Sequence, residues 1–305
     1  GGGGGGPALG YLFGLLGTLT LVKSASTLQA EQYLAPFARG EKICAFALSE
    51  PDAGTNSFNI KTTAVAEGGG FRINGNKWFI TNIDNSDALL LVAKTAPSGK
   101  EAVKSGSLSL FLIDLPNESL DYTPIPKHGF NYYKSNQLFI EDLFVPESAL
   151  VGTLGKGFAS LAPTLNAERL LVAAGSIGLA RLALSSAVLY ASERVVFDVP
   201  IGAHQAVQHP LAAAHARLES AWWTVRQAAA MEDQGDQSAH ATALANTAKY
   251  VAVEAAIDAC YHSLQAHGGA GYAREYHQER WWREVQLFRL APLTQQMTLN
   301  FIGQH

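Results

Sequence analysis

Histidine is the side chain here that most often binds metal or moves protons, and the chain contains nine. Two pairs, His204 with His209 and His262 with His267, are close enough in sequence to suggest a metal site. Each pair is five residues apart, whereas residues that share one helical face are three or four apart. We therefore expect ordinary polar or capping histidines and no metal site.

Several common catalytic motifs are missing from the sequence. No GxGxxG follows a predicted strand, and the glycines at 1–6 that match the pattern have neither strand nor helix beside them. Gly155-Lys156-Gly157 lacks the upstream glycine and the Ser or Thr of a P-loop. No HExxH or GxSxG is present. These observations argue against a Rossmann site, a P-loop, a zinc protease and an α/β-hydrolase.

Composition narrows the classes of function further. The 305 residues include 22 basic and 26 acidic side chains, a net charge of −4 that argues against a nucleic-acid surface. The mean hydropathy of +0.05 argues against several membrane spans. The apolar segment 8–22 is shorter than the roughly 20 residues of a span, so we expect a buried helix. Two cysteines, Cys44 and Cys260, argue against a disulfide scaffold and fit a reducing compartment.

Three passages with different patterns must position the chemistry. Residues 25–38 have helical spacing, and this helix should end near Pro36. From about 44 to 152 the chain changes to β-rich runs separated by turn signals such as Pro97–Lys100. No long helical pattern interrupts these runs, so we expect a mostly antiparallel barrel or sandwich. Within it, FRINGNKWFI (71–80) predicts a hairpin that turns at Asn74-Gly75.

The passage from 153 to 305 is rich in alanine, leucine and glutamine and predicts an up-down four-helix bundle. The expected helices are Asn166–Val195 with Asn166 as N-cap, Leu211–Met231 after a connection bracketed by Pro200 and Pro210, Ala239–His267, Glu275–Phe288, and a last one after Pro292. The predicted fold is thus an α+β multidomain protein. Its parts are a glycine tract with partial N-terminal helices (1–43), a central mostly antiparallel β domain (44–152) and a C-terminal four-helix bundle (153–305).

Six segments, in order, resemble the acyl-CoA dehydrogenase family of flavoproteins. FALSEPDAGTNS (46–57) resembles its first signature, INGNKWFITN (73–82) its second, and LFIEDLFVPESALVG (138–152) the end of its β domain. Its C-terminal helices and flavin-contacting turns resemble three further segments, NAERLLVAAGSIGLA, SERVVFDVPIGAHQAVQHPLA and LQAHGGAGYAREYHQERWWREVQLFRL. The resemblance covers nearly everything from about residue 28, and it implies the family's fold and its FAD cofactor.

The resemblance also implies which residues of this chain contact the flavin. A flavin needs backbone donors at the polar edge of its ring and an aromatic or apolar lid. Phe46, Leu48 and Ser49 match the family's segment along the ring, Phe79 matches the aromatic packing, and Thr81 matches the hydroxyl that bonds the ring edge. Either segment alone is equally typical of a buried strand.

In this family the adenine end of the flavin is bound by a neighbouring subunit, which implies a homodimer or homotetramer. Arg194 matches the guanidinium for the pyrophosphate, and Phe197 matches the aromatic beside the adenosine. Asp198 stands where the family usually has glycine, and a carboxylate there is unfavourable unless it points away. The remaining matched flavin contacts are Gln205, Gln265, Gly268, Gly269, Thr294 and Gln296. Gly268-Gly269 fits a close approach of backbone to phosphate, or simply a helix stop.

The family removes the α-proton of an acyl-CoA thioester and transfers a β-hydride to the flavin, which gives a trans-2-enoyl thioester. A weakly acidic α-proton requires a carboxylate base. In most members the base is the Glu of a Tyr-Glu-Gly-Thr segment, whose position here is occupied by Pro292. A subset carries the Glu before an Arg on the first bundle helix, which matches Glu168 and Arg169. We expect Glu168 to be the base. Alternatively, it is a first-turn acid stabilised by the helix dipole at Asn166.

Pro292 raises a second question, because the backbone N–H at that position normally donates to the thioester carbonyl. Proline has no N–H, and losing one such donor costs a factor of about 100 or more in rate. Either another N–H serves, or the thioester binds differently. Arg169 either lines the acyl thioester pocket or pairs with Glu168, and Thr55 matches a position near the pantetheine or the flavin phosphates.

The leading hypothesis is an FAD-dependent acyl-CoA dehydrogenase of fatty acid β-oxidation that passes electrons to electron-transfer flavoprotein. Two alternatives remain: a flavin oxidase or monooxygenase on the same fold, and a flavin- or CoA-binding homologue without turnover. We expect no membrane span, no nucleic-acid partner, and a cytoplasmic location (the mitochondrial matrix in a eukaryote). Family members begin with a larger helical domain, so the glycines at 1–6 resemble a junction at a truncated start.

Overall fold

The computed structural model describes residues 6–96 and 107–304. The chain divides into two compact units, which are described separately below. The sheet unit comprises residues 10–127 and 131–165, and the helical unit comprises mainly residues 166–305 together with 128–130. The turn expected at Pro97–Lys100 lies outside the described residues.

The sheet unit begins with helices. Helix α1 spans Gly6–Ser24, and a second helical stretch follows as α2 (Thr27–Gln29), a π-helical turn (Ala30–Leu34) and α3 (Ala35–Ala38). A capping box starts the second stretch: Gln29 N–H donates to Ser26 Oγ, and Ser26 N–H donates to Gln29 Oε1. The chain stays helical to Ala38, so the predicted end near Pro36 is two residues early.

The sheet is mixed rather than purely antiparallel. Its strands lie in the order β6-β7-β3-β2-β4-β5-β8, with β1 added on β4. Strands β1 and β2 both run parallel to β4, and the other pairs of this sheet are antiparallel. The strands are β1 (Cys44–Ala47), β2 (Thr63–Glu67), β3 (Gly70–Thr81), β4 (Ala88–Ala96), β5 (Leu108–Asp114), β6 (Leu120–Pro124), β7 (Ser135–Pro146) and β8 (Leu150–Val151).

The predicted hairpin turn at Asn74-Gly75 is wrong. Strand β3 continues through both residues, and the chain turns earlier, at Gly68 and Gly69, which both have positive φ. Asn74 pairs with Thr63 of β2, and the register against β7 shifts between Ile73 and Gly75. The Asn-Gly signal therefore marks a bulge inside a long strand. Glycine is needed at 75 because an added Cβ would meet Thr62 Oγ1 at 2.3 Å.

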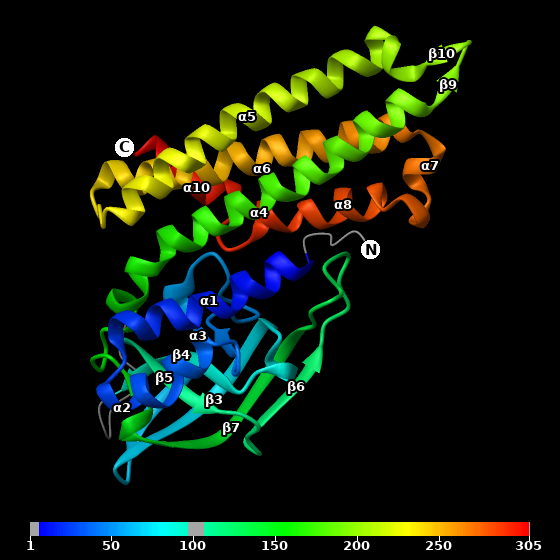
Figure 1. The fold of residues 1–305 in the computed structure, drawn as a ribbon. Coiled ribbons are helices and arrows are strands. Elements are labelled where there is room, and N and C mark those ends of the chain that lie inside the picture. Colours follow the sequence, from blue (N-terminus) through cyan, green and yellow to red (C-terminus); the bar gives the residue numbers. More distant parts are fainter. Residues whose placement is uncertain (1–5, 97–106, 305) are drawn as a thin grey trace. The chain divides into compact units, whose positions relative to one another are not determined.

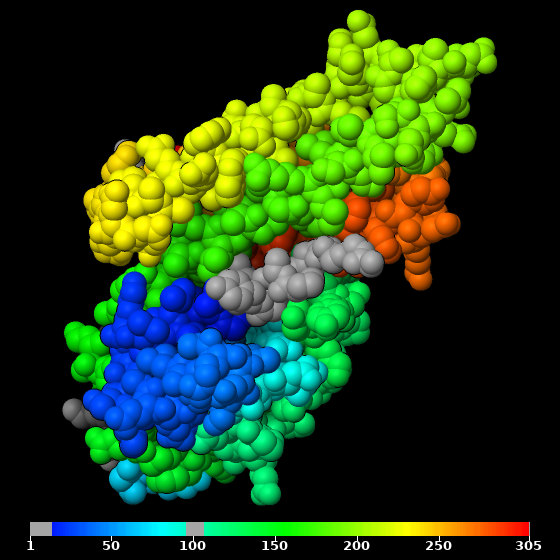
Figure 2. All heavy atoms as spheres, viewed as in Figure 1, coloured from blue at the N-terminus to red at the C-terminus, as the bar shows by residue number. Residues whose placement is uncertain are grey.

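Strand β4 forms the centre of the sheet unit and is buried on both faces. Leu89 and Leu91 belong to one apolar cluster, while Leu90 and Val92 belong to another on the opposite face. The second cluster also contains Leu21 of α1 and Tyr33 of the π-helical turn. Figure 2 shows these N-terminal helices, in blue, covering part of the sheet unit. A strand that is covered on both faces has a continuous run of apolar residues, and β4 has the run ALLLVA (88–93).

Long helices dominate the helical unit (Figure 1). They are α4 (Gly157–Glu193, which begins in the sheet unit), α5 (Gln205–Asp233) and α6 (Ala239–His267), followed by α7 (Gly269–Tyr272), α8 (Gln278–Val285), α9 (Leu287–Leu290) and α10 (Gln295–Gly303). A two-strand hairpin, β9 (Val195–Val196) and β10 (Val199–Pro200), joins α4 to α5. The predicted bounds of α6 are confirmed. A row of buried alanines along α6 allows its neighbours to pack closely.

Two helix starts differ from prediction. Helix α4 begins more than two turns before Asn166, so Asn166 is not its N-cap. Helix α5 begins at Gln205, not Leu211. Both starts were missed because Pro163 and Pro210 lack a backbone N–H, and each helix accommodates its proline near its beginning.

Helix α4 is the one helix of the described part that is long and apolar enough to cross a membrane by length and composition. Half of its most apolar window is buried inside the protein, and the core helix of a soluble protein meets the same two criteria.

Candidate active site

The two signature segments of the sheet unit lie side by side. Phe46 is in β1, and Leu48 and Ser49 follow directly after it. The N–H of Trp78 in β3 donates to the Ser49 carbonyl at 2.8 Å. All three predicted ring contacts keep part of their surface accessible. The structure thus brings FALSEP next to the WFIT end of β3, although the two are separated by the whole of β2.

A second bulge in β3 turns Phe79 outward. The register against β7 shifts between Lys77 and Ile80, and Phe79 lies there with φ of 60°. Its side chain is 55% exposed, which is unusual for a large aromatic at the centre of a sheet unit. Bulges of this kind re-aim a side chain at a functional edge. Farther along β3, Thr81 Oγ1 lies 3.1 Å from Ser135 Oγ. Thr55 is exposed in the loop after Ala53.

Glu168 lies well inside helix α4, so the alternative of a first-turn acid stabilised by the helix dipole is wrong. Although part of its surface is accessible, burial of the carboxyl group raises its pKa to about 7, and the nearby Arg169 charge opposes that rise without cancelling it. No hydrogen bond or ion pair to the Glu168 carboxyl group occurs within residues 6–96 and 107–304. A carboxylate with a pKa near neutrality and no partner is a suitable general base.

Arg169 does not pair with Glu168. Its Nη1 donates to Asn166 Oδ1 at 2.7 Å, and Asn166 Nδ2 donates in turn to Thr242 Oγ1 on α6 at 3.3 Å. The guanidinium is therefore held by a neutral amide against the neighbouring helix. This arrangement leaves the carboxylate of Glu168 unneutralised.

Lys249 holds the segment that follows Pro292, and sequence reasoning missed it. Its buried ammonium donates to the Leu293 carbonyl at 2.7 Å and to Gln295 Oε1 at 3.2 Å. Burial and the nearby Arg169 charge lower the Lys249 pKa to about 8, although Glu254 opposes both. Thr294 caps α10 by accepting from Met297 N–H, and Gln296 is exposed in the first turn of the same helix.

A second group of predicted contacts lies at the other end of the helical unit. Arg194 directly follows α4 and is exposed, and no acidic partner for it occurs among the described residues. Phe197 and Asp198 form the turn of the β9–β10 hairpin, with φ of 54° and 65°. Both positive φ values match a two-residue hairpin turn, and Asp tolerates the left-handed region better than most side chains, so the loop forms without the family's glycine. Phe197 is 86% exposed.

Of the two readings of Gly268-Gly269, the helix stop agrees with the structure. No heavy atom lies within 4 Å of a Cβ built on either residue, so close packing within the chain is not the reason for them. Gly268 is required by its backbone, φ 56° and ψ −134°, where α6 ends. Gly271 is the closely packed glycine, since its Cβ would meet the Leu264 carbonyl oxygen at 2.5 Å.

The two groups in the helical unit are too far apart to surround one end of a single flavin. A helix rises about 1.5 Å per residue, so Glu168 lies roughly 38 Å from the end of α4, where Arg194 follows. Along α6, Lys249 lies about 24 Å from Gln265. Figure 1 shows the β9–β10 hairpin and α7 at the same end of these helices. Gln205 and Gln265, both exposed, belong to that end.

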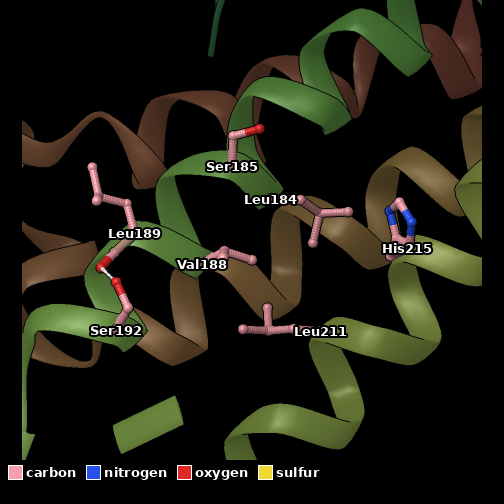
Figure 3. A pocket seen from close by; sticks show the side chains of 7 residues that line it. All are labelled: Leu184, Ser185, Val188, Leu189, Ser192, Leu211 and His215. Atoms are coloured by element: carbon pink, nitrogen blue, oxygen red, sulfur yellow. Dashed lines mark hydrogen bonds between the residues drawn. The ribbon is translucent and has the colours of Figure 1, made fainter. Parts of the chain in front are cut away.

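Two open grooves lie on the helical unit, and no predicted site residue lines either one. A groove of about 430 Å³ between α4 and α5 (Figure 3) is lined by Leu184, Ser185, Val188, Leu189, Ser192, Leu211 and His215. A larger one, of about 940 Å³, lies over α5, α6 and α8. Within the described residues no three His, Cys, Asp or Glu side chains gather as a metal site would require.

Two models of a known protein family match this chain. The family model described as acyl-CoA dehydrogenase, middle domain, matches residues 45–143, and the model described as acyl-CoA dehydrogenase, C-terminal domain, matches residues 155–305. Acyl-CoA dehydrogenase FadE12 of Mycobacterium tuberculosis is 39% identical over 278 residues, which cover 90% of this chain and 70% of that protein. The chain belongs to the acyl-CoA dehydrogenase family.

Solved structures agree with the family assignment. Butyryl-CoA dehydrogenase from Megasphaera elsdenii superposes with a TM-score of 0.92 at 28% identity, covering 99% of this chain and 78% of that chain. The FAD complex of PigA superposes with a TM-score of 0.90 at 27% identity, covering 98% of this chain and 77% of that chain. The chain has the acyl-CoA dehydrogenase fold, and its cofactor is FAD.

The residues present fit this cofactor. In the sheet unit, the outward-turned Phe79 offers an aromatic surface beside the backbone of Ser49. In the helical unit, Arg194 offers an unneutralised guanidinium, the group suited to a pyrophosphate, beside the exposed ring of Phe197. In this acyl-CoA dehydrogenase, both groups of residues thus have the chemistry that FAD requires.

Proposed function

We propose that the chain oxidises an acyl-CoA thioester to the trans-2-enoyl-CoA, with Glu168 taking the α-proton. FAD, when bound, supplies the acceptor for the β-hydrogen and its electron pair. One observation carries the assignment of the base: the Glu168 carboxyl group has a pKa of about 7 and no partner among the described residues. It is deprotonated in a large fraction of molecules at neutral pH, yet basic enough to accept a proton.

The neighbours of Glu168 support this role. Arg169 is tied to Asn166, so it contributes positive charge near the thioester pocket without neutralising the base. We propose that Arg169 and Thr55 contact the substrate. The flavin contacts that we propose are Phe46, Leu48, Ser49, Phe79, Thr81, Arg194, Phe197, Gln205, Gln265, Gly268, Gly269, Thr294 and Gln296.

The separation along the helices supports a homo-oligomer. Because Arg194 follows the end of α4 and lies roughly 38 Å from Glu168, we propose that the Arg194 end binds the adenine half of an FAD whose ring is bound by another subunit. We further propose a cytoplasmic enzyme of fatty acid β-oxidation whose reoxidant is electron-transfer flavoprotein.

Pro292 favours a second candidate, a flavin- and CoA-binding protein without turnover. The position lacks both the usual carboxylate and the backbone N–H. If no other donor serves the thioester carbonyl, the loss of rate is a factor of about 100 or more.

Anaerobic mixing of the FAD-loaded protein with butyryl-, octanoyl- and palmitoyl-CoA separates the candidates. Bleaching of the flavin by at least one of them, with formation of the 2-enoyl-CoA, is the expected result. Glu168→Gln should slow bleaching by at least 1,000-fold, while Glu193→Gln, at the exposed end of the same helix, should not change it. Equal rates in wild type and Glu168→Gln would exclude Glu168 as the base, and no bleaching with any acyl-CoA would favour the non-catalytic candidate.

A further inference from the structure

A buried ion pair lies behind the two signature segments of the sheet unit. Lys77 Nζ is 2.9 Å from Glu50 Oε1, and the Lys77 side chain is 0% exposed. Glu50 ends the FALSE segment, and Lys77 lies two residues before Phe79 on β3. The pair therefore joins the two segments that were matched to the flavin.

The carboxylate of Glu50 is fully supported by its surroundings. It accepts hydrogen bonds from Lys61 N–H at 2.5 Å, from Thr62 N–H at 3.0 Å and from Thr62 Oγ1 at 2.5 Å. Burial raises its pKa, but Lys77 and these donors outweigh burial and lower the pKa overall. Burial lowers the Lys77 pKa to about 8, and Glu50 opposes that effect. Both groups are therefore ionised at neutral pH.

Such a pair is a poor source of stability. Removing two charges from water costs several kcal/mol per ion, and replacing buried pairs by neutral groups is often harmless or stabilising. A buried pair is better explained by what it holds in place. Here the ammonium makes one more contact, to the Leu48 carbonyl at 2.9 Å.

This contact fixes the direction of the Leu48–Ser49 peptide. The peptide is trans, so its N–H points opposite to its C=O. With the Leu48 carbonyl directed at buried Lys77, the Ser49 N–H is directed away from it, and no acceptor for it occurs among the described residues. The next carbonyl, that of Ser49, is held by Trp78 N–H at 2.8 Å. The direction of the Ser49 N–H is thus fixed by hydrogen bonds to the carbonyl groups on either side of it.

We propose that Lys77, held by Glu50, is a positioning residue for the flavin: it orients the Ser49 N–H toward the polar edge of the ring. Lys77 does not touch the cofactor itself and acts through the Leu48 carbonyl. The proposal rests on the flavin contacts assigned under the proposed function, but it does not depend on Glu168 or on any acyl-CoA.

The test measures FAD binding and flavin potential in variants of the full chain. Lys77→Met removes the contact to Leu48. The double variant Lys77→Met/Glu50→Gln also removes the contact but leaves no uncompensated charge. Its single amide oxygen can still accept from Thr62, as Glu50 Oε1 does, whereas Lys61 N–H loses its acceptor at Glu50 Oε2. Ile113→Ala creates a cavity on β5, outside both segments in sequence, and serves as the control for loss of stability.

Titration of each apoprotein with FAD should show at least a tenfold rise in the dissociation constant for both Lys77 variants. The midpoint potential of the bound flavin should also fall below that of wild type, because a lost donor stabilises the reduced ring less. Ile113→Ala should lower the melting temperature with the dissociation constant within threefold of wild type and the potential unchanged. If the single variant does not fold, the double variant decides alone.

The proposal is overturned if the double variant binds FAD within threefold of wild type at an unchanged potential, or if Ile113→Ala weakens FAD equally. The outcome is separable from that of the proposed function. A wild type that binds FAD but is not bleached by any acyl-CoA contradicts the dehydrogenase, whereas an active enzyme with unaffected Lys77 variants contradicts only this inference.

Discussion

Arg169 donates to the side-chain oxygen of Asn166 at 2.7 Å, and this neutral partner keeps its charge from pairing with the adjacent Glu168. Burial raises the pKa of Glu168 to about 7, and the Arg169 charge acts against that rise without cancelling it. The pKa of the proposed base therefore depends on the side-chain amide of Asn166, which binds Arg169.

Replacing Asn166 should change the pH dependence of flavin reduction. In wild type the rate should rise with pH through an apparent pKa near 7, as Glu168 loses its proton. In Asn166→Ala the guanidinium is free to turn toward Glu168, which lowers the carboxyl pKa and moves the acid limb down by about one pH unit. Stopped-flow rates of flavin reduction from pH 5.5 to 9 measure the position of this acid limb. Thr242→Val, which spares the Asn166–Arg169 bond, is the control. An unmoved limb in Asn166→Ala would contradict this tuning.

Glu168→Gln should stabilise the protein in a pH-dependent way. The folded pKa of about 7 lies above the ordinary 4.5, so between these values the folded state binds more protons than the unfolded state. Wild-type stability therefore falls as pH rises from 4.5 to 7, and the penalty persists above pH 7. Thermal unfolding should show a higher melting temperature for the variant at pH 8 and nearly equal temperatures near pH 4. A gain that is the same at both pH values would rule out this linkage.

Lys249→Met should loosen the Pro292 segment. The change leaves the Leu293 carbonyl and the Gln295 side-chain oxygen without their buried donor, and each unsatisfied group costs about 1–3 kcal/mol. Amide hydrogen exchange in residues 291–297 should accelerate, and flavin reduction at saturating acyl-CoA should slow by about tenfold with little change in substrate affinity. Lys156→Met, at an exposed lysine, should change neither. Unaltered exchange in Lys249→Met would show that this lysine does not hold the segment.

Gly268→Ala should be much more costly than Gly269→Ala. The φ and ψ of Gly268 are adopted by few other residues, so alanine there should cost on the order of 1–3 kcal/mol. Gly269 is not in the left-handed region and has no heavy atom within 4 Å of an added Cβ, so its alanine variant should stay within about 0.5 kcal/mol of wild type. Urea unfolding of both variants compares them. Equal losses would mean that the Gly268 backbone relaxes easily.

Much of the fold was readable from local pattern. The long helices of the last passage and the exact bounds of α6 follow from alanine-rich runs ended by glycine. The errors occurred where long-range packing overrides a local signal. Asn74-Gly75 has the composition of a turn, but pairing with β2 and β7 carries the strand through it. Pro163 and Pro210 look like helix stops, yet each is tolerated near a helix start.

The sequence by itself determined the family, the order of the segments and the residues that match the flavin and the base, because these properties are carried by residue type and spacing. Only the tertiary structure decided that Glu168 is desolvated and unpaired, that Lys77 faces Glu50, and that Lys249 holds the Leu293 carbonyl. The physical reason is that desolvation and ion pairing depend on atoms contributed by distant parts of the chain. Glu50 and Lys77 are 27 positions apart in the sequence, for example, and the chain between them must fold into strands and a turn before the two charges can meet.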